Sequence, residues 1–216
     1  CALTTEEIKQ TVQDFRHAAR CAIEAGADGV EIHGANAYLI QQFFAPSANT
    51  RTDEYGGSIE NRARFAIEVA TAIVEEIGAD KTGIRLSPGA LLWGIDEGQE
   101  GPELYRYLVK ELNKLGLVYL HVMHLGNEEL LQDIRQIWTQ ALIINRPGRP
   151  RENIGTDIES GLADLESYGQ MILANPDFVS RLQQNLPMNE ADNTTYYGGD
   201  AQGYVDYPTL NTSTEI

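Results

Sequence analysis

The sequence predicts an α/β fold of the (β/α)8 barrel type, and three observations support this prediction. Short apolar strands alternate with amphipathic helices, which indicates a parallel sheet with helices packed outside it. Polar residues stand near the carboxyl ends of four strands, where parallel α/β folds bind their ligands. No G-x-G-x-x-G turn follows a strand, which disfavours an open dinucleotide-binding sheet. Five strands are expected and a closed barrel needs eight, so the chain corresponds to about the last five β/α units.

Local signals predict each element in chain order. Thr4 or Thr5 caps the first helix, Glu7 completes a capping box with Thr4, and Gly26 ends the helix. Ser58 caps the helix that follows a polar loop at 45–57, and Pro102 opens another helix. Strands are expected at residues 29–33, 82–87, 118–123, 141–145 and 165–168. Helices are expected at residues 5–26, 37–44, 58–78, 102–115, 127–139, 156–161 and from 176 onward.

The sequence predicts that the chain has two parts. Residues 1–185 are expected to form the C-terminal part of a barrel. Residues 186–216 are polar and tyrosine-rich and are expected to form an extended tail that packs on the barrel.

Composition and charge narrow the class of partner. The 216 residues are 42% hydrophobic and 22% charged, which is ordinary for a globular protein, but the net charge is −16. Nucleic acids and anionic membranes attract basic patches, so neither is an expected partner. Cys1 and Cys21 define no disulfide framework and no metal-ligand spacing, so no metal is expected and a reducing, cytoplasmic setting fits. No leader or membrane-spanning run is evident, and a start at Cys1 instead of Met favours a fragment or processed piece.

The segment after the first strand carries three candidate functional side chains, His33, Asn36 and Tyr38. Strand side chains alternate, so His33 lies opposite Val30 and Ile32 at the carboxyl end of the strand. In one interpretation His33 is a satisfied core histidine, Asn36 caps the next helix and Tyr38 packs. In the other, His33 and Asn36 hydrogen-bond a substrate oxygen and polarise a conjugated double bond toward hydride. Tyr38, a phenol that keeps its proton at neutral pH, then protonates the α carbon. Spacing alone leaves both interpretations open.

Two adjoining motifs resemble the Old Yellow Enzyme family of FMN-dependent ene-reductases, which includes proteins similar to N-ethylmaleimide reductase. Residues 33–43, HGANAYLIQQF, resemble its signature, and residues 49–62, NTRTDEYGGSIENR, resemble its second hallmark. The resemblance continues through GIRLSP at 83–88, ANPD at 174–177 and the tail from YYGG at 196–199. It covers nearly the whole chain but only about the C-terminal three fifths of a family member. The loop at 49–62 is expected to be structural, pinned by Arg/Asp pairs and the Ser58 cap.

The resemblance implies roles for the candidate residues. His33 and Asn36 would bind the electron-withdrawing group of an activated alkene, and Tyr38 would be the proton donor. Arg85 would face the pyrimidine edge of FMN; its alternative is an ion pair in the barrel wall. Hydride would pass from NAD(P)H to the flavin and then to the β carbon. Trp93 stands where some relatives carry a glutamine near the substrate.

The phosphate end and the tail match the family less closely. Gly148 and Arg149 match the loop that binds the FMN phosphate, while Gly169 is followed by Gln170 where the family has arginine. Arg146 or Arg149 would replace the lost charge; the alternative is that this segment is a solvated basic loop. Tyr197 matches a tail tyrosine that lines the substrate pocket in some members. His121 is assigned no role.

The expected partners follow from what the chain lacks of a barrel. The first three strands of the family supply much of the flavin contact, so we expect the chain to need a missing N-terminal half, from the same or another chain, or to form a homo-oligomer. It would be a fragment, half of a split enzyme or a remnant. The alternative functions are a non-catalytic half-barrel that serves in assembly, or another FMN-barrel reaction such as demethylation or dienoyl reduction.

Overall fold

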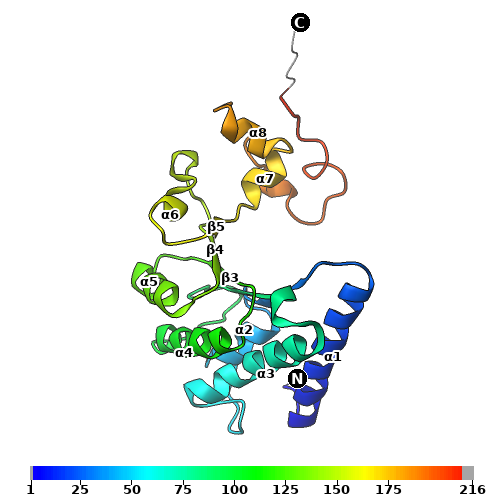
Figure 1. The fold of residues 1–216 in the computed structure, drawn as a ribbon, viewed down its shortest axis with the longest axis vertical. Helices are drawn as coiled ribbons and strands as arrows, with labels where there is room; N and C mark the ends of the chain where they lie inside the picture. The colour runs from blue at the N-terminus through cyan, green and yellow to red at the C-terminus, as the bar shows by residue number, and fades with distance from the viewer. Residues whose placement is uncertain (1, 211–216) are drawn as a thin grey trace, which may run out of the picture. The chain divides into compact units, whose positions relative to one another are not determined.

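The computed structural model describes residues 2–210, so Cys1 and the last six residues of the expected tail lie outside the described residues (Figure 1). The chain divides into two compact units at Glu166/Ser167. In chain order the elements are α1 (Thr5–Glu24), β1 (Val30–Gly34), α2 (Leu39–Phe44), α3 (Ile59–Ile77), η1 (Ala79–Lys81), β2 (Thr82–Leu86), α4 (Gly101–Lys114), β3 (Tyr119–Met123), α5 (Glu128–Ile137), β4 (Ala141–Asn145), η2 (Arg151–Asn153), α6 (Thr156–Glu159), β5 (Leu165–Glu166), α7 (Gln170–Ala174), α8 (Phe178–Gln183) and η3 (Asn193–Thr195).

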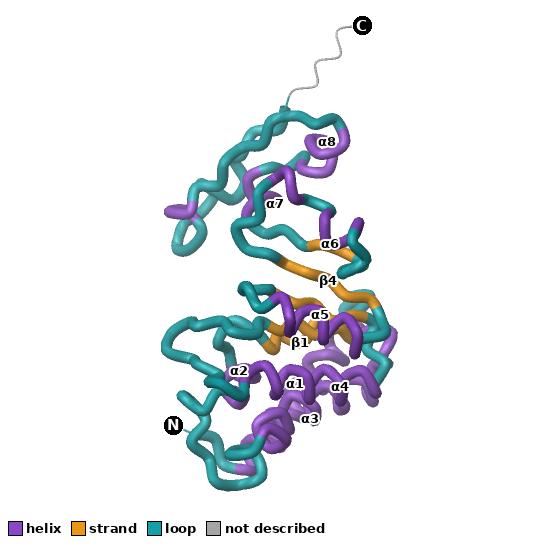
Figure 2. Tube along the Cα trace, turned by 90° about the vertical axis from the view of Figure 1, so that its left-hand side faces the viewer, coloured by secondary structure: helices purple, strands orange, loops and turns teal. Residues whose placement is uncertain are grey.

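The first unit holds one sheet of five parallel strands in the order β1-β2-β3-β4-β5. Its strands are drawn in orange in Figure 2. The predicted alternation and all five strand positions are confirmed. The fifth strand is shorter than expected and ends at Glu166. The next residues belong to the second unit, where the rings of Tyr168 and Phe178 pack 5.6 Å apart. The second unit also holds α7, a helix that the sequence did not predict.

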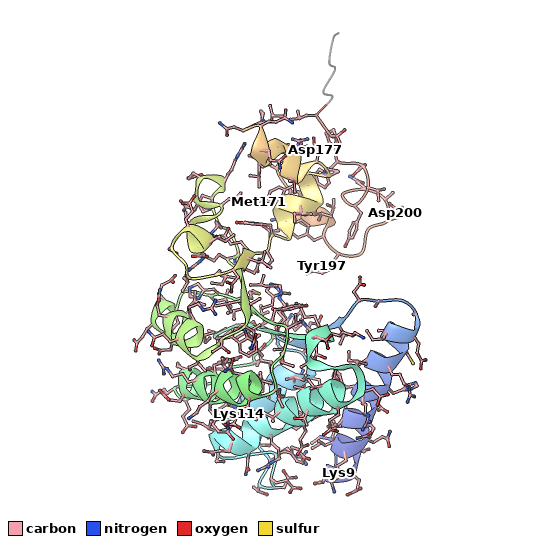
Figure 3. All side chains as sticks on the ribbon, viewed as in Figure 1. Lys9, Lys114, Met171, Asp177, Tyr197 and Asp200 are labelled. Carbon is pink, nitrogen blue, oxygen red and sulfur yellow. The ribbon has the colours of Figure 1, made fainter. Side chains whose placement is uncertain are left out.

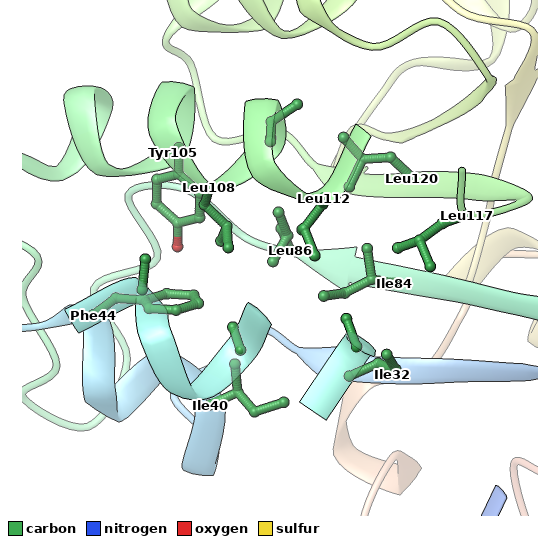
Figure 4. Close-up of a cluster of buried hydrophobic side chains, with 14 of the residues drawn as sticks. Ile32, Ile40, Phe44, Ile84, Leu86, Tyr105, Leu108, Leu112, Leu117 and Leu120 are labelled. Carbon is green, nitrogen blue, oxygen red and sulfur yellow. The ribbon is translucent and has the colours of Figure 1, made fainter. Parts of the chain in front are cut away.

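The helices cover one face of the sheet and form its core. Neighbouring helices pack in the order α1, α3, α4, α5. The strand residues that point toward them are almost fully buried (Figure 4), and these include Ile32, Ile84, Leu86, Leu120 and Val122. Each such side chain contributes about 1.5–3 kcal/mol by leaving water, so this apolar layer fixes the face of each strand that turns inward.

The helix ends follow the predicted signals. The Thr4 hydroxyl accepts a hydrogen bond from the Glu7 N–H at 3.2 Å, and Glu7 accepts one in return from the Thr4 N–H at 2.7 Å. Ser58 accepts from the Asn61 N–H at the start of α3, and Pro102 lies in the first turn of α4. These contacts satisfy backbone donors that have no partner inside a helix.

On the other face of the sheet, polar side chains of neighbouring strands lie side by side in rows. The strand register places Glu31, Gly83 and Tyr119 side by side on β1, β2 and β3. A Cβ atom on Gly83 would come within 2.3 Å of the Tyr119 ring, because that ring crosses over Gly83 toward Glu31. The glycine is therefore required by the tyrosine on the neighbouring strand.

The second unit is organised around a buried arginine. Arg181 donates to the Asp177 carboxylate at 2.6 Å, to the Pro187 carbonyl at 2.8 Å and to the Pro208 carbonyl at 2.7 Å. It is 1% exposed and ties α8 to the irregular segment after it. Asp177 and Tyr197 of this unit are labelled in Figure 3. Whether the segment after residue 185 packs on a barrel stays a prediction.

None of the helices within residues 2–210 combines the length and apolar character needed to cross a membrane.

Gly83→Ala should lower the free energy of unfolding by about 1–3 kcal/mol, because the new methyl group overlaps the Tyr119 ring. Urea denaturation of the two proteins measures the difference. The matched control is the same substitution in a Tyr119→Ala background, where the ring is gone and the cost should largely disappear. An equal cost in both backgrounds would contradict the crossing of Tyr119 over Gly83.

Candidate active site

The first candidate residues lie on a bent link between β1 and α2. β1 ends at Gly34, where a Cβ atom would come within 3.0 Å of the Arg85 carbonyl oxygen. Asn36 and Ala37 then adopt left-handed backbone conformations with φ of 57° and 64°. Tyr38 is the N-cap residue of α2, and its side chain makes no capping hydrogen bond. The interpretation of Asn36 as a helix cap is therefore wrong.

Three aromatic rings gather at this link. The ring centroids of His33 and Tyr38 are 5.2 Å apart, and those of Tyr38 and Trp93 are 5.8 Å apart in an edge-to-face arrangement. Tyr38 is 52% exposed, Trp93 is 77% exposed, and His33 is exposed on the sheet face. The interpretation of His33 and Tyr38 as core residues is therefore wrong. Trp93 comes from the loop between β2 and α4 and stands beside the candidate proton donor.

Arg85 lies next to His33 on the neighbouring strand. It forms no ion pair within the described part of the chain, so the alternative of an ion pair in the barrel wall is not supported. Its Nε atom is buried and has no hydrogen-bond partner among residues 2–210, and the same holds for Oδ1 of Asn36. A buried polar atom without a partner costs about 1–3 kcal/mol, so two of them at one end of the sheet fit a polar ligand there.

The electrostatics keep His33 neutral. Burial lowers the pKa of His33, the Arg85 guanidinium lowers it further, and Glu31 opposes both effects. The imidazole therefore carries no charge at neutral pH, and it donates one hydrogen bond and accepts another.

Glu31 lies two residues before His33 on β1, on the same face of the sheet, and two residues of β3 hydrogen-bond its carboxylate. His121 Nδ1 and Glu31 Oε2 are 3.0 Å apart, and Tyr119 also hydrogen-bonds Glu31. Burial alone would raise the pKa of Glu31, but hydrogen bonds from His121 and Tyr119 and the charge of Arg85 bring it below its usual value. Burial and the Glu31 carboxylate raise the pKa of Tyr119 to about 12. His121, to which the sequence assigned no role, thus holds the carboxylate that faces Arg85.

The arginines after β4 are held by carboxylates. Arg149 contacts Asp157 at 2.6 Å and also pairs with Glu166, and its side chain is 7% exposed. Arg146 contacts Asp157 at 2.8 Å and Glu128 at 2.5 Å, and it lowers the pKa of Glu128 to about 2. The alternative of a solvated basic loop is wrong. Both charges are matched by carboxylates on α5, α6 and β5, so neither arginine fits the role of an uncompensated phosphate ligand.

Three candidate residues fall in the second unit. Gly169 is the N-cap residue of α7 and Gln170 is its first residue. Tyr197 is 91% exposed (Figure 3). Gly148, in the first unit, has a φ of 71° in the turn that precedes Arg149. The roles of these four residues in cofactor or substrate binding stay predictions.

The loop at 49–62 is structural, as expected. The Asn49 amide donates to the carbonyl oxygens of Phe43 and Tyr55 at 2.7 Å each, and Arg51 pairs with Asp53 at 2.5 Å. These contacts join the start of the loop to its middle and to the end of α2.

Sequence reasoning missed a buried hydrogen-bond network behind the aromatic rings. Gln41, Ser87, Glu97 and Tyr105 are all at most 6% exposed and are joined by hydrogen bonds. One signal was present in the sequence, because Gln41 is a polar residue between the apolar positions Ile40 and Phe43 of a short helix.

Comparisons with known proteins agree with this arrangement. Residues 1–189 match the model of the NADH:flavin oxidoreductase / NADH oxidase family. The chain is 46% identical to putative 12-oxophytodienoate reductase 3 of Oryza sativa subsp. japonica, over 99% of this chain and 58% of that protein. It is 44% identical to 12-oxophytodienoate reductase 2 of Arabidopsis thaliana, over 98% of this chain and 59% of that protein.

Solved structures give the same result. Morphinone reductase in complex with tetrahydroNAD matches with a TM-score of 0.92 at 40% identity, over 100% of this chain and 59% of that chain. The old yellow enzyme homologue from Zymomonas mobilis matches with a TM-score of 0.90 at 33% identity, over 97% of this chain and 61% of that chain. The chain thus spans about three fifths of the relatives it matches, and its fold is a partial barrel.

Ala37→Gly should raise the free energy of unfolding by about 1 kcal/mol, because glycine adopts a left-handed conformation without the strain of a Cβ atom. Thermal or urea denaturation measures the change. Ala35→Gly is the control, since Ala35 is outside the left-handed pair and fully buried, and should destabilise. Equal effects of the two substitutions would contradict the strained turn.

Arg85→Met should raise the pKa of His33, because a neighbouring positive charge that disfavours the imidazolium is removed while Glu31 remains. NMR titration of the His33 ring protons measures it, with a His33→Asn variant to identify the signal. Arg85→Lys keeps the charge and should shift the titration less. A lower His33 pKa in Arg85→Met would refute this account of its electrostatics.

Proposed function

The chain belongs to the NADH:flavin oxidoreductase / NADH oxidase family, and we propose that it forms part of an FMN-dependent ene-reductase that uses NAD(P)H to reduce activated C=C bonds of α,β-unsaturated carbonyl compounds. The observation that supports the proposal is a pair of buried polar atoms with no hydrogen-bond partner within residues 2–210, one on Asn36, three residues after His33, and one on Arg85, beside His33 on the neighbouring strand. A segment built for packing alone would leave neither atom without a partner.

The residues of this chain suit distinct parts of that reaction. A flavin bound beside Arg85 would supply hydride to the β carbon of the alkene. Neutral His33 and the Asn36 amide would donate hydrogen bonds to the carbonyl oxygen, where negative charge develops; one such donor is commonly worth about 10²- to 10³-fold in rate. Tyr38, half-exposed beside both groups, would deliver the proton to the α carbon.

This chain offers a better site for the ring of a flavin than for its phosphate. Arg85 offers a partly buried guanidinium whose Nε atom has no hydrogen-bond partner within residues 2–210, which fits the electron-rich edge of the ring. At the phosphate end, Arg149 is neutralised by Asp157 and Glu166, and Gln170 is uncharged. We therefore assign FMN to this chain through its ring end, and leave Gly148, Arg149, Gly169 and Gln170 as proposed contacts.

A non-catalytic role in assembly is the second candidate. The neutralised arginines favour it, because they weaken the case for a phosphate site in this chain. Its partner would be the segment that completes the barrel, or a second copy. A cytoplasmic setting remains an expectation from the sequence.

A visible spectrum separates the two functions. The chain is purified with any partner that accompanies it, titrated with FMN, and tested for reduction by NADH and NADPH. Bound flavin that transfers hydride to a cyclic enone supports the ene-reductase. A colourless protein that binds no added FMN, alone or with its partner, refutes it and favours the assembly module.

Tyr38→Phe should lower enone reduction by about 10²- to 10⁴-fold, the usual contribution of a general acid, and leave flavin reduction by NAD(P)H unchanged. Stopped-flow absorbance follows the two half-reactions separately. Tyr107→Phe, on α4, is the control and should leave both rates intact. Unchanged enone reduction in Tyr38→Phe would remove Tyr38 as the proton donor.

A further inference from the structure

We propose that Gln41 is the positioning residue of the candidate site, because it holds the left-handed turn that carries Asn36 and delivers Tyr38. The inference rests on the proposed function only for the chemistry of those two residues. The mechanical role of Gln41 stands on the contacts themselves.

Gln41 is fully buried, and both the oxygen and the nitrogen of its side-chain amide form hydrogen bonds that hold the turn. Its Oε1 atom accepts from the Ala37 N–H at 2.7 Å and from the Ser87 hydroxyl at 3.0 Å. The Ser87 oxygen in turn accepts from the Asn36 N–H at 2.8 Å. Both backbone N–H groups of the strained pair are therefore held, directly or through Ser87, by one side-chain oxygen.

The amide nitrogen of Gln41 anchors this arrangement to the rest of the fold. It donates to the Ser87 carbonyl at 3.0 Å and to Glu97 at 2.6 Å. The Tyr105 hydroxyl also donates to Glu97, and the Tyr105 ring meets Phe44 edge to face at 5.8 Å in the core (Figure 4). Gln41 thus links the turn to the Ser87 backbone just past β2 and, through Glu97 and Tyr105, to α4 and the apolar layer. Ser87 and Gln42 add direct hydrogen bonds to the Asn36 N–H and the Ala37 carbonyl.

Glu97 extends the same network to the loop that carries Trp93. Its second oxygen accepts from the Gly89 N–H at 2.8 Å, and Gly89 and Glu97 flank the exposed segment of that loop. Trp93 meets the Tyr38 ring at the other end. Gln41 therefore couples the turn of the proton donor to the loop whose tryptophan stands over it.

Packing alone does not explain a glutamine at this position. The side chain is fully buried, with its amide nitrogen 3.4 Å from the Tyr105 hydroxyl, and methionine would fill a similar volume without burying an amide. All the polar atoms of the Gln41 side chain have partners, and two left-handed non-glycine residues depend on them. Such strain persists where surrounding contacts enforce it, and it is concentrated at functional sites.

Gln41→Met tests the proposal by hydrogen exchange on the full chain. The reporters are the Asn36 and Tyr38 amides, which donate to Ser87 and to the Ala35 carbonyl and not to Gln41. Both should exchange about tenfold faster or more in the variant. The indole N–H of Trp138, which donates to the Ala141 carbonyl, should keep its rate. The core variant Ile144→Ala is the control for general destabilisation and should not single out the turn.

Two further variants sharpen the result. Ala37→Gly in the Gln41→Met background should restore part of the lost protection at Tyr38, because glycine needs no help to stay left-handed. Ser87→Ala is a smaller change that keeps the test valid if Gln41→Met does not fold. The Ala37 N–H should exchange faster in this variant although its own acceptor, Gln41 Oε1, remains, because the Ser87 hydroxyl that donates to this oxygen is gone.

Unchanged exchange at the reporters, or acceleration equal to that of the Trp138 indole, overturns the proposal. Enone reduction by the flavin-loaded protein is read separately: it should fall in Gln41→Met while flavin reduction by NAD(P)H holds. If the wild-type protein reduces no enone, the proposed function fails, and the exchange result still decides the role of Gln41.

Discussion

The parallel register between β1 and β2 is the constraint on which the site depends. It sets His33 beside Arg85 and Glu31 beside Gly83. Because parallel strands end at the same edge, it also brings Ser87, just past β2, to the turn that follows β1. A slip of one residue would turn the polar rows into the apolar core, so the buried layer beneath the helices also secures the chemistry above it.

The polar face keeps the His33 imidazole neutral beside the charge of Arg85. Arg85 lies between a neutral imidazole and a carboxylate that is already hydrogen-bonded by His121 and Tyr119. This leaves the guanidinium without an ion-pair partner in the described part of the chain, and its Nε atom unpartnered. A fixed positive charge in that position suits a ligand whose polar edge carries negative charge.

After β4, near the other edge of the sheet, the positive charges of two arginines are paired with carboxylates. Arg146 and Arg149 share Asp157, and each has a second carboxylate of its own. Such a closed network stabilises its own geometry, but a phosphate would have to compete with it. The chain is therefore better prepared for a flat polar ligand at β1 and β2 than for an anion after β4. A ligand-binding role requires that a phosphate be held near these arginines after β4, whereas an assembly role does not.

The sequence by itself determined the order of strands and helices, the caps at Thr4 and Ser58, and the resemblance to the Old Yellow Enzyme family, which the family match confirms. These features depend on neighbours within a turn or a strand, and periodicity and motifs record them. Only the tertiary structure decided that Arg149 is neutralised by Glu166, and that Gln41 and Glu97 hold the turn. Those partners lie 17 and 56 residues apart along the chain, and no local pattern records which distant side chain will meet a buried polar group.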